Sequence, residues 1–311
     1  MKLMNILITG GSGYIGSYLT KTLLDQGHQV DIIARSENEF IRNYSDKIGV
    51  YYADITLPFD FKVKDIQYDI FIHLGAANDI DSADPSYAIN ASVLGTRYAL
   101  DFCVRNNIKK AIYYSTFQVY GAVEGGMSEN SILQPTNDYG ITHQFAEQYF
   151  EMYQRTKGID YIVIRPTNIF GSPMYRSTDR WSLVPSCFCK EAFEKGEINL
   201  MSSGLQKRDF IDVNDLAVAS AIYCANFDSY KNKTINVSSG INYTIVEIAH
   251  LVSQQFKNQF NKDCRINIHS EMPLSENVFY LCREEVSKIN HDFGGKEKMT
   301  NEITAIFKVL S

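Results

Sequence analysis

Three glycines, Gly10, Gly13 and Gly16, directly follow the apolar run Ile6-Leu7-Ile8 and precede an apolar-periodic stretch. A strand, a glycine turn and a helix in this order bring backbone close to a pyrophosphate. Gly10 permits a sharp turn, Gly13 removes the Cβ that would block the phosphates, and Gly16 lets the helix pack on the sheet. The helix N-terminus near Tyr14 then directs free N–H groups and a positive dipole end at the anion. The sequence therefore predicts a dinucleotide-binding site.

The composition is that of an ordinary globular chain of 311 residues with a formal net charge of −6. This length fits one large α/β unit or two lobes. The negative balance argues against nucleic-acid binding, which needs a basic face. No apolar run reaches membrane-spanning length, and the chain enters its first strand without room for a signal peptide. We expect a cytoplasmic protein with neither nucleic acid nor membrane as a partner.

The cysteines and histidines, six of each, show no metal-binding spacing. We expect reduced core thiols and no metal site. His73 is interpreted as a packed residue at a strand end. The cysteines are Cys103, Cys187, Cys189, Cys224, Cys264 and Cys282.

Short apolar strands alternate with helical patterns through the first half, which is typical of parallel βαβ units. Strands are predicted at residues 5–9, 29–34, 50–53, 69–74, 110–115 and 161–165, and helices at 14–26, 87–106 and 139–156. We expect an α/β fold with a doubly wound parallel sheet of the Rossmann type. Ligands bind such sheets at the carboxyl ends of the strands. We therefore expect one crevice lined by Gly10, Ala34, His73, Ser115 and Pro166.

Beyond Pro166 the alternation loosens into loops, with a helix predicted at 215–227 and a strand at 234–238. Residues 288–300 are interpreted as a surface loop before a terminal helix. The predicted division is a dinucleotide-binding domain at 1–170 with a return segment near 208–240. A smaller C-terminal substrate lobe would comprise residues 171–207 and 241–311.

Four further segments carry a family resemblance: HLGAA at 73–77, STFQVYG at 115–121, YGITH at 139–143 and RPTNIFG at 165–171. A fifth, RDFIDVND at 208–215, resembles an element of the second lobe of nucleotide-sugar enzymes. In order and spacing, these segments resemble the extended short-chain dehydrogenase/reductase family of nucleotide-sugar epimerases, dehydratases and ketoreductases. Together they are more specific than any one motif.

The resemblance implies that Thr116 and Tyr139 are the catalytic pair. Moving a hydride onto or off a carbinol carbon requires a proton to move at its oxygen. Thr116 would hydrogen-bond that oxygen while Tyr139 acts as acid or base. In the family, a lysine four residues after the tyrosine lowers the pKa of the phenol and holds the nicotinamide ribose; here that position is His143. Tyr153 and Lys157 have the same spacing, but they lie at the far end of the helix, about 20 Å from Tyr139.

The replacement of the lysine by His143 leaves three alternatives. His143 is a weaker substitute that is cationic only below about pH 6.5. Alternatively, the enzyme works in the reductive direction, for which a protonated tyrosine is already the required acid. In the third alternative the site is degenerate and binds ligand without turnover. We favour the reductive direction because it depends least on a lysine that lowers the pKa of the tyrosine. The simplest structural interpretation of His143 is a helix residue with no catalytic role.

The end of the second predicted strand bears on the form of the cofactor. An NAD site usually ends this strand with a carboxylate that binds the ribose 2′-hydroxyl. Here Asp31 lies too early, and Arg35 and Ser36 are suited to a 2′-phosphate. NADP is therefore favoured over NAD. The glycine turn and the resemblance together imply cofactor contacts by Gly10, Gly13, Tyr14, Ile15, Gly16, Arg35, Ser36, Asp54, Ile55, Leu74, Gly75, Ala76, Ser115, Tyr139, His143 and Pro166.

On the substrate side, the resemblance implies contacts by Asn168, Arg208 and Ser92. Asn168 would touch the phosphate or sugar, and Arg208 would bind the nucleotide diphosphate. Ser92 stands where the family has an asparagine. Phe117 and Gln118 follow Thr116 in place of the Asp-Glu pair of sugar dehydratases, so dehydration is disfavoured.

The leading hypothesis is an NADP(H)-dependent reductase of a nucleotide-activated 4-keto-sugar, of the sort used to build bacterial surface polysaccharide. The alternatives are a nucleotide-sugar epimerase with retained NAD and a non-catalytic nucleotide-binding protein. The family likeness also implies a homodimer in which helices 87–106 and 139–156 of two subunits form a bundle.

Overall fold

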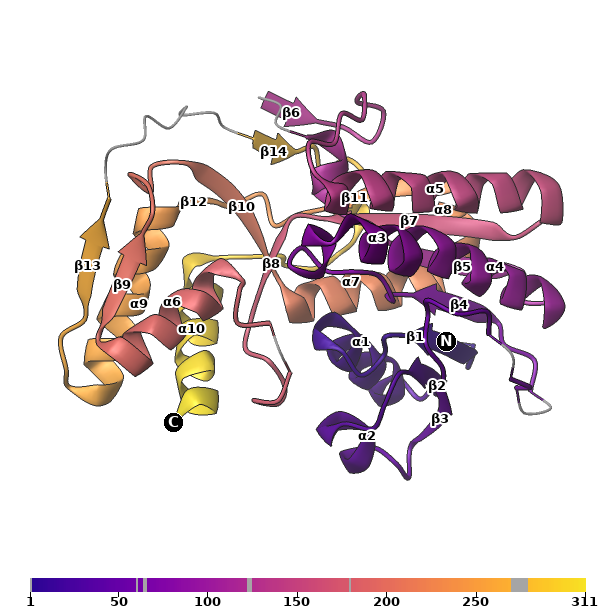
Figure 1. Ribbon diagram of the computed structural model, residues 1–311, viewed down its shortest axis with the longest axis horizontal. Coiled ribbons are helices and arrows are strands. Elements are labelled where there is room, and N and C mark those ends of the chain that lie inside the picture. Colours follow the sequence, from indigo (N-terminus) through magenta and orange to yellow (C-terminus); the bar gives the residue numbers. More distant parts are fainter. Residues whose placement is uncertain (1, 60, 64–65, 122–124, 179, 270–278) are drawn as a thin grey trace. The chain divides into compact units, whose positions relative to one another are not determined.

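The computed structural model describes residues 2–59, 61–63, 66–121, 125–178, 180–269 and 279–311. Within these residues, seven strands form one sheet in the order β11-β7-β5-β4-β1-β2-β3 (Figure 1). Neighbours from β7 to β3 pair in parallel. The strands are β1 Asn5–Thr9, β2 Gln29–Ala34, β3 Ile48–Tyr52, β4 Ile70–His73, β5 Lys110–Tyr114, β7 Asp160–Pro166 and β11 Lys233–Val237. The predicted Rossmann-type doubly wound sheet is confirmed.

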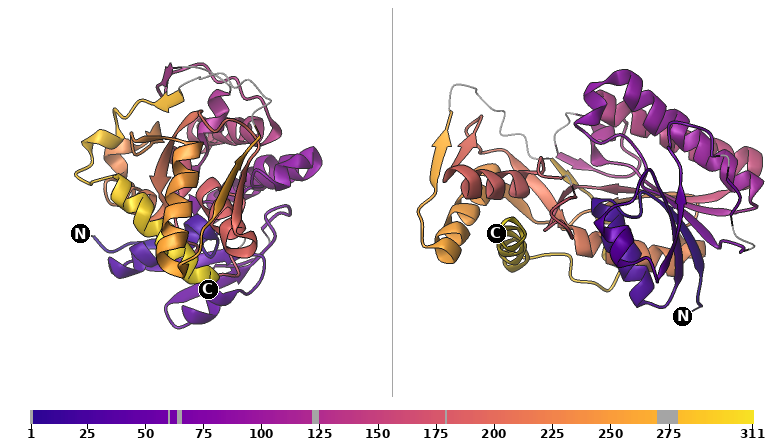
Figure 2. Two further views of the ribbon diagram at one scale, coloured as in Figure 1. Left: turned by 90° about the vertical axis from the view of Figure 1, so that its left-hand side faces the viewer. Right: turned by 60° about the horizontal axis from the view of Figure 1, so that its bottom comes forward.

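Helices cover both faces of this sheet (Figure 2). Helices α4 (Gly95–Arg105) and α5 (Asp138–Lys157) pack their buried side chains against one face, in a core with Leu7, Phe71 and Tyr113. Helices α1 (Tyr14–Asp25) and α7 (Val213–Ala225) lie on the other face, where the Tyr114 hydroxyl donates to Ser220 of α7. Neighbouring β5 residues thus point to opposite layers, as the alternation of strand side chains requires.

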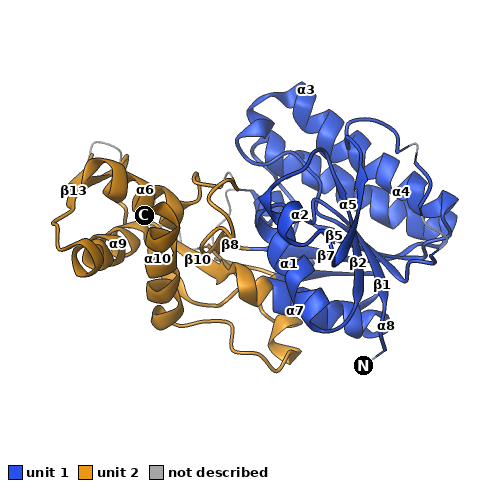
Figure 3. Cartoon of the chain, turned by 90° about the horizontal axis from the view of Figure 1, so that it is seen from below, with its two compact units in different colours: residues 1–122, 129–166, 217–236 blue, residues 123–128, 167–216, 237–311 orange. Residues whose placement is uncertain are grey.

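The chain divides into two compact units (Figure 3). Unit 1 comprises residues 1–122, 129–166 and 217–236, and unit 2 comprises 123–128, 167–216 and 237–311. The segment that returns to unit 1 is shorter than the 208–240 predicted from the sequence. The smaller helices of unit 1 are α2 Glu39–Asn43, α3 Pro85–Ala88 and α8 Phe227–Tyr230, with 3-10 turns η1 Asp81–Ala83 and η3 Phe117–Tyr120.

Unit 2 is more regular than its sequence suggested. The helix predicted at 215–227, the strand at 234–238 and the terminal helix are present as α7, β11 and α10 (Lys296–Leu310), but the loops predicted around them contain further helices and strands. The helices of unit 2 pack around a core that includes Phe256, Ile303 and Phe307. Most strands of unit 2 have only three or four residues, too few to show an alternating apolar pattern in the sequence. The elements are β6 Gly125–Met127, β8 Asn168–Phe170, α6 Val184–Lys195, β9 Glu197–Leu200, β10 Lys207–Asp212, β12 Asn242–Thr244, α9 Ile245–Phe260, β13 Arg265–Ile268, β14 Phe279–Leu281, η4 Val286–Lys288 and α10 Lys296–Leu310.

Most predicted bounds differ from the structure by one or two residues, and two predicted segments differ by more. The helix predicted at 87–106 consists of α3, a wider π-helical segment η2 at Ile89–Leu94, and α4. At the junction a Cβ on Gly95 would lie 2.8 Å from the Ile55 carbonyl oxygen, so the close approach of the loop after β3 requires glycine there. The predicted loop 288–300 is also too long, because α10 already begins at Lys296.

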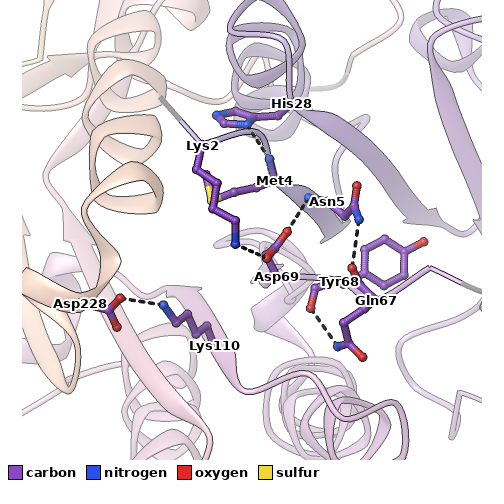
Figure 4. A network of polar contacts seen from close by, with 9 residues as sticks. All are labelled: Lys2, Met4, Asn5, His28, Gln67, Tyr68, Asp69, Lys110 and Asp228. Atoms are coloured by element: carbon purple, nitrogen blue, oxygen red, sulfur yellow. Dashed lines mark hydrogen bonds and ion pairs between the residues drawn. The ribbon is translucent and has the colours of Figure 1, made fainter.

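A polar network joins the amino ends of β1 and β4 (Figure 4). Asp69 accepts from the Asn5 N–H at 2.9 Å and pairs with Lys2. The Nδ1 atom of His28 accepts from the Met4 N–H. Burial lowers the pKa of His28. These groups lie at the edge opposite the carboxyl ends of the strands, and they therefore support the sheet rather than the predicted crevice.

Candidate active site

The glycine turn has the geometry that a bound pyrophosphate requires. Gly10 has a φ of +69°, in the left-handed region that favours glycine. A Cβ on Gly16 would lie 2.0 Å from the Gly10 carbonyl oxygen, so α1 can approach the turn only with glycine at this position. The N-cap Gly13 makes no side-chain capping bond, and the first turn of α1 holds no acidic residue. These features fit a dinucleotide at the N-terminus of α1, next to Tyr14 and Ile15.

Thr9, the last residue of β1, fixes the loop after β4. Its hydroxyl oxygen accepts from the N–H groups of Leu74 at 3.2 Å and Gly75 at 3.1 Å. The hydroxyl proton is then directed at Nδ1 of His73, which lies 2.7 Å away. Sequence reasoning missed Thr9, although it directly precedes Gly10. Its bonds hold Leu74 and Gly75, both predicted to contact the cofactor, beside the glycine turn.

His73 is a packed residue, as interpreted from the sequence. Its Nε2 lies 3.1 Å from the Thr96 hydroxyl, which donates to the Ser92 carbonyl. Burial lowers the pKa of His73 to about 3. The Ser92 side chain is fully buried, and its hydroxyl accepts from the Ala77 N–H at 3.0 Å. In the structure Ser92 therefore braces a loop; its contact with substrate stays a prediction.

Thr116 and Tyr139 begin two elements that lie close together. Thr116 caps η3, and its hydroxyl oxygen accepts from the Gln118 N–H. Tyr139 lies in the first turn of α5, whose N-cap Asn137 donates to the Gln118 side chain at 2.8 Å. A Cβ on Gly140 would lie 2.7 Å from the Gln118 carbonyl oxygen, so this glycine allows the contact. The motif segments at 115–121 and 139–143 are thus brought together at the carboxyl end of β5.

His143 lies one turn after Tyr139, and the two rings meet edge to face with centroids 4.6 Å apart. The Nδ1 atom of His143 is 2.6 Å from the Tyr113 hydroxyl of β5. Its Nε2 is buried without a hydrogen-bond partner among the described residues. Burial lowers the pKa of His143 to about 3. This burial disfavours the charged imidazole and so argues against the alternative in which His143 is a cation just below pH 6.5.

A buried ion pair anchors α5 to the sheet. The Arg165 guanidinium of β7 donates through Nε and Nη2 to the two oxygens of Glu147, at 2.9 and 2.6 Å. It also donates to the Tyr120 hydroxyl of η3 at 2.8 Å. One side chain thus ties together the strand, the helix that carries Tyr139 and the turn that follows Thr116.

The end of β2 carries no carboxylate. Arg35 and Ser36 are exposed there, and Nη1 of Arg35 lies 3.4 Å from the Tyr87 hydroxyl. The Asp31 carboxylate lies within the sheet and accepts hydrogen bonds from the Gly49 N–H and the Tyr68 hydroxyl.

Asp54, in the loop after β3, accepts from the N–H and the hydroxyl of Thr56. These bonds, with a smaller contribution from Arg35, lower the pKa of Asp54. Ile55 follows and is half-buried. Both residues are placed beside the end of β2 by the pairing of β2 with β3.

Ser115 and Pro166 lie at the carboxyl ends of β5 and β7. The Ser115 N–H donates to the Ile164 carbonyl at 2.8 Å. The Ser115 hydroxyl is buried and has no hydrogen-bond partner in the described part of the chain. A buried hydroxyl of this kind is consistent with a ligand contact.

The predicted substrate residues Asn168 and Arg208 belong to unit 2. The Asn168 amide donates to the Asp209 carbonyl at 2.9 Å, which links β8 to β10. Arg208 lies on β10 with an exposed side chain.

The described residues lack a cluster of metal ligands and a membrane-spanning helix. These residues contain no group of three or more His, Cys, Asp or Glu side chains placed to hold a metal, and none of their helices is long and apolar enough to cross a membrane. The six cysteines are free thiols.

Known proteins resemble this chain over most of its length. GDP-6-deoxy-D-talose 4-dehydrogenase of Aggregatibacter actinomycetemcomitans is 26% identical and covers 99% of this chain and 94% of its own. UDP-glucose 4-epimerase of Halalkalibacterium halodurans is 28% identical, with 81% and 80% covered. The solved UDP-N-acetylglucosamine 4-epimerase from Methanobrevibacter ruminantium superposes with a TM-score of 0.82 at 23% identity, covering 100% of this chain and 99% of that one.

A family model described as the NAD dependent epimerase/dehydratase family matches residues 6–238. This span contains the glycine turn, Thr116, Tyr139 and the segment at 208–215. The chain therefore belongs to the NAD-dependent epimerase/dehydratase family and is an NAD(P)-dependent enzyme of the extended short-chain dehydrogenase/reductase type.

Proposed function

We propose that this enzyme reduces a nucleotide-activated 4-keto-sugar to the corresponding alcohol. The observation that carries the proposal is the burial of a neutral His143 beside Tyr139, without an ammonium group at that position. A positive charge would favour the phenolate that alcohol oxidation needs as a base. Without it the phenol keeps its proton, and a protonated phenol is the acid that carbonyl reduction needs.

In this reaction Thr116 binds the keto oxygen. Its hydroxyl oxygen already accepts from the Gln118 N–H, so the hydroxyl proton is directed outward to donate. Tyr139 gives its proton to the same oxygen as the carbonyl carbon becomes tetrahedral, a role worth about 10²- to 10⁴-fold in rate. When bound, the reduced nicotinamide supplies the hydride. The keto-sugar thus gains a hydride at carbon and a proton at oxygen.

The residues that would hold the cofactor are those of the glycine turn, the 74–76 loop and the ends of β2, β5 and β7. We favour NADP because Arg35 provides a planar guanidinium at the end of β2 and no carboxylate competes there. A solved structure with a similar fold, UDP-glucuronic acid 4-epimerase from Bacillus cereus, is in complex with NAD. NAD is therefore the alternative cofactor.

Arg35→Ala tests this preference. A lost charge-assisted contact raises the Kd of NADPH about tenfold or more and leaves that of NADH unchanged. Arg42→Ala is the matched control, because Arg42 pairs with Glu37 on the surface of α2. Equal losses for both cofactors in Arg35→Ala would reject the 2′-phosphate contact.

Asn168 and Arg208 of unit 2 are the residues that we expect to bind the substrate. Ser92 of unit 1, which stands where the family has an asparagine, is the third predicted substrate contact. The diphosphate is the part of the substrate that suits a guanidinium. Products of such reductions would serve the assembly of surface polysaccharide.

A homodimer through α4 and α5 is supported by apolar residues on α5 that face solvent. Ile141 and Phe145, one turn apart, are 37% and 44% exposed. Exposed apolar pairs of this kind are suited to a partner helix. Sedimentation equilibrium tests the dimer, and a monomer at micromolar concentration would contradict it.

Cofactor stoichiometry tests the reduction. Purified enzyme is incubated with NADPH and a panel of UDP-, GDP- and dTDP-4-keto-sugars, and we expect one NADPH oxidised for each alcohol formed. A nucleotide-sugar epimerase is the second candidate, since UDP-glucose 4-epimerase is among the relatives. It would interconvert sugar alcohols without net loss of cofactor. Tight cofactor binding without turnover on any nucleotide sugar would point instead to a degenerate site.

A further inference from the structure

Tyr113 is a fully buried residue of β5 whose hydroxyl has His143 as its hydrogen-bond partner. The phenol ring lies between aromatic neighbours, with centroids 5.8 Å from His73 and 5.0 Å from Phe150. His143 itself is 3% exposed. The hydrogen bond between the hydroxyl and the imidazole is therefore shielded from water.

Both groups are neutral in this environment. Burial raises the pKa of Tyr113 well above its ordinary value, and the neighbouring Glu147 and Tyr139 raise it further. Burial alone accounts for the lowered pKa of His143. The pair therefore has one O–H and one N–H to distribute between the Tyr113 oxygen and the two ring nitrogens.

Only one of the two distributions leaves a single polar atom unsatisfied. If Tyr113 donates to Nδ1, the ring proton lies on Nε2, and this N–H is the one buried donor without a partner. If Nδ1–H donates to Tyr113 instead, both the phenol proton and the Nε2 lone pair lose their partners. Each buried unsatisfied group is costly, so the first arrangement is favoured.

We propose that Tyr113 is a positioning residue that holds His143 as the Nε2–H tautomer, and that this N–H is a neutral donor for an oxygen of the bound cofactor. Nε2 is buried, lacks a partner among the described residues, and belongs to a ring in contact with Tyr139. The family likeness already implies that this position contacts the nicotinamide ribose; the hydrogen bond from Tyr113 adds which ring nitrogen carries the proton for that contact. This assignment rests on the proposed function for its ligand, but not for the tautomer.

The test is ¹⁵N NMR of the His143 imidazole in the cofactor-free protein, combined with titration of NADPH and NADH. We expect a single tautomer protonated at Nε2 in the natural chain. In Tyr113→Phe both tautomers become populated, and the Kd of the cofactor rises about three- to tenfold, the effect of one ordinary hydrogen bond.

Tyr114→Phe is the matched control. It removes a neighbouring buried hydroxyl of the same strand, which bonds Ser220 on the opposite face. Its His143 spectrum and cofactor Kd should equal those of the natural chain, with fold checked by circular dichroism in both variants. An Nδ1–H tautomer in the natural chain, or an unchanged spectrum in Tyr113→Phe, would overturn the assignment. An Nε2–H tautomer in a protein that binds neither cofactor would reject the ligand and the proposed function while leaving the tautomer intact.

Discussion

Helix α5 carries the same spacing of tyrosine and basic residue at both of its ends. Tyr139 and His143 lie in the first turns, and Tyr153 and Lys157 lie in the last. At the N-terminal end the helix meets η3, which Thr116 caps. The two ends share a sequence pattern, but only the first lies at the carboxyl edge of the sheet, where ligands of doubly wound folds bind.

At the C-terminal end, the partner of the tyrosine lies on a neighbouring helix. The Tyr153 hydroxyl donates to the Asp101 carboxylate of α4. Burial and this bond raise the pKa of Tyr153, and Lys157 lies exposed at the helix end. Tyr153 is thus part of the α4–α5 packing. A tyrosine and a basic residue at i and i+4 therefore suit catalysis only where the helix lies beside the carboxyl end of a strand, and their spacing alone does not indicate an active site.

The sharpest way to break this comparison is to remove one phenol hydroxyl at each end. Tyr139→Phe should lower turnover about 10²- to 10⁴-fold in both directions, because the proton donor is lost. Tyr153→Phe should leave turnover within about twofold and lower the free energy of unfolding by about 1 kcal/mol, since it removes one hydrogen bond. Steady-state rates and urea unfolding provide the measurements. Equal activity of Tyr139→Phe and the natural chain would remove the mechanism.

A second prediction concerns the buried neutral state of His143. Its pKa in the folded chain is about 3, below the ordinary value near 6.5, so the unfolded chain binds a proton first as the pH falls. Stability due to this group is therefore present above about pH 6.5 and is lost as the pH falls toward 3. The slope is at most about 1.4 kcal/mol per pH unit for one proton.

Urea unfolding between pH 7 and pH 4 measures this slope. His143→Gln should flatten it by one proton, and His250→Gln, at an exposed position of α9, should not. Identical slopes in the natural chain and His143→Gln would mean that the imidazole has the same pKa in the folded and unfolded chains, which contradicts its burial as a neutral group.

The smallest expected effect comes from exchanging the basic residues. His143→Lys introduces an ammonium beside Tyr139, which lowers the pKa of the phenol and should raise the rate of alcohol oxidation at neutral pH on the order of tenfold. Lys157→His should leave that rate unchanged. The measurement is the initial rate of oxidation of the nucleotide sugar alcohol, with thermal melts as a check on folding. No gain in His143→Lys would show that charge at this position does not control the direction of reaction.

Much of unit 1 was predictable because its signals are local. The predicted bounds of β1 and β2 are those of the structure, since each is an apolar run ended by a turn. Thr116, Tyr139 and His143 were found through motif spacing, and their roles stay proposals. Helix α9 was missed although its capping box, Thr244 with Glu247, is a sequence signal.

The remaining features depend on contacts between distant segments. The Tyr113 hydroxyl reaches His143 only because β5 and α5 pack together, and no pattern in either segment records this. The same packing buries the imidazole and lowers the pKa of His143 from the free-histidine value. Thr9 was missed for a similar reason, because its partners lie more than sixty residues further along the chain.

The buried pairing of Arg165 with Glu147 constrains how this enzyme can diverge. A substitution that removes one member leaves an unpaired charge in the interior and lowers the free energy of unfolding by about 3–5 kcal/mol. Replacement of both members by apolar side chains of similar volume is often tolerated. A lineage that abandons this pair must therefore change two codons almost together or pass through an unstable ancestor. A design that transfers the α5 face to another scaffold should therefore include Arg165 and Glu147 together.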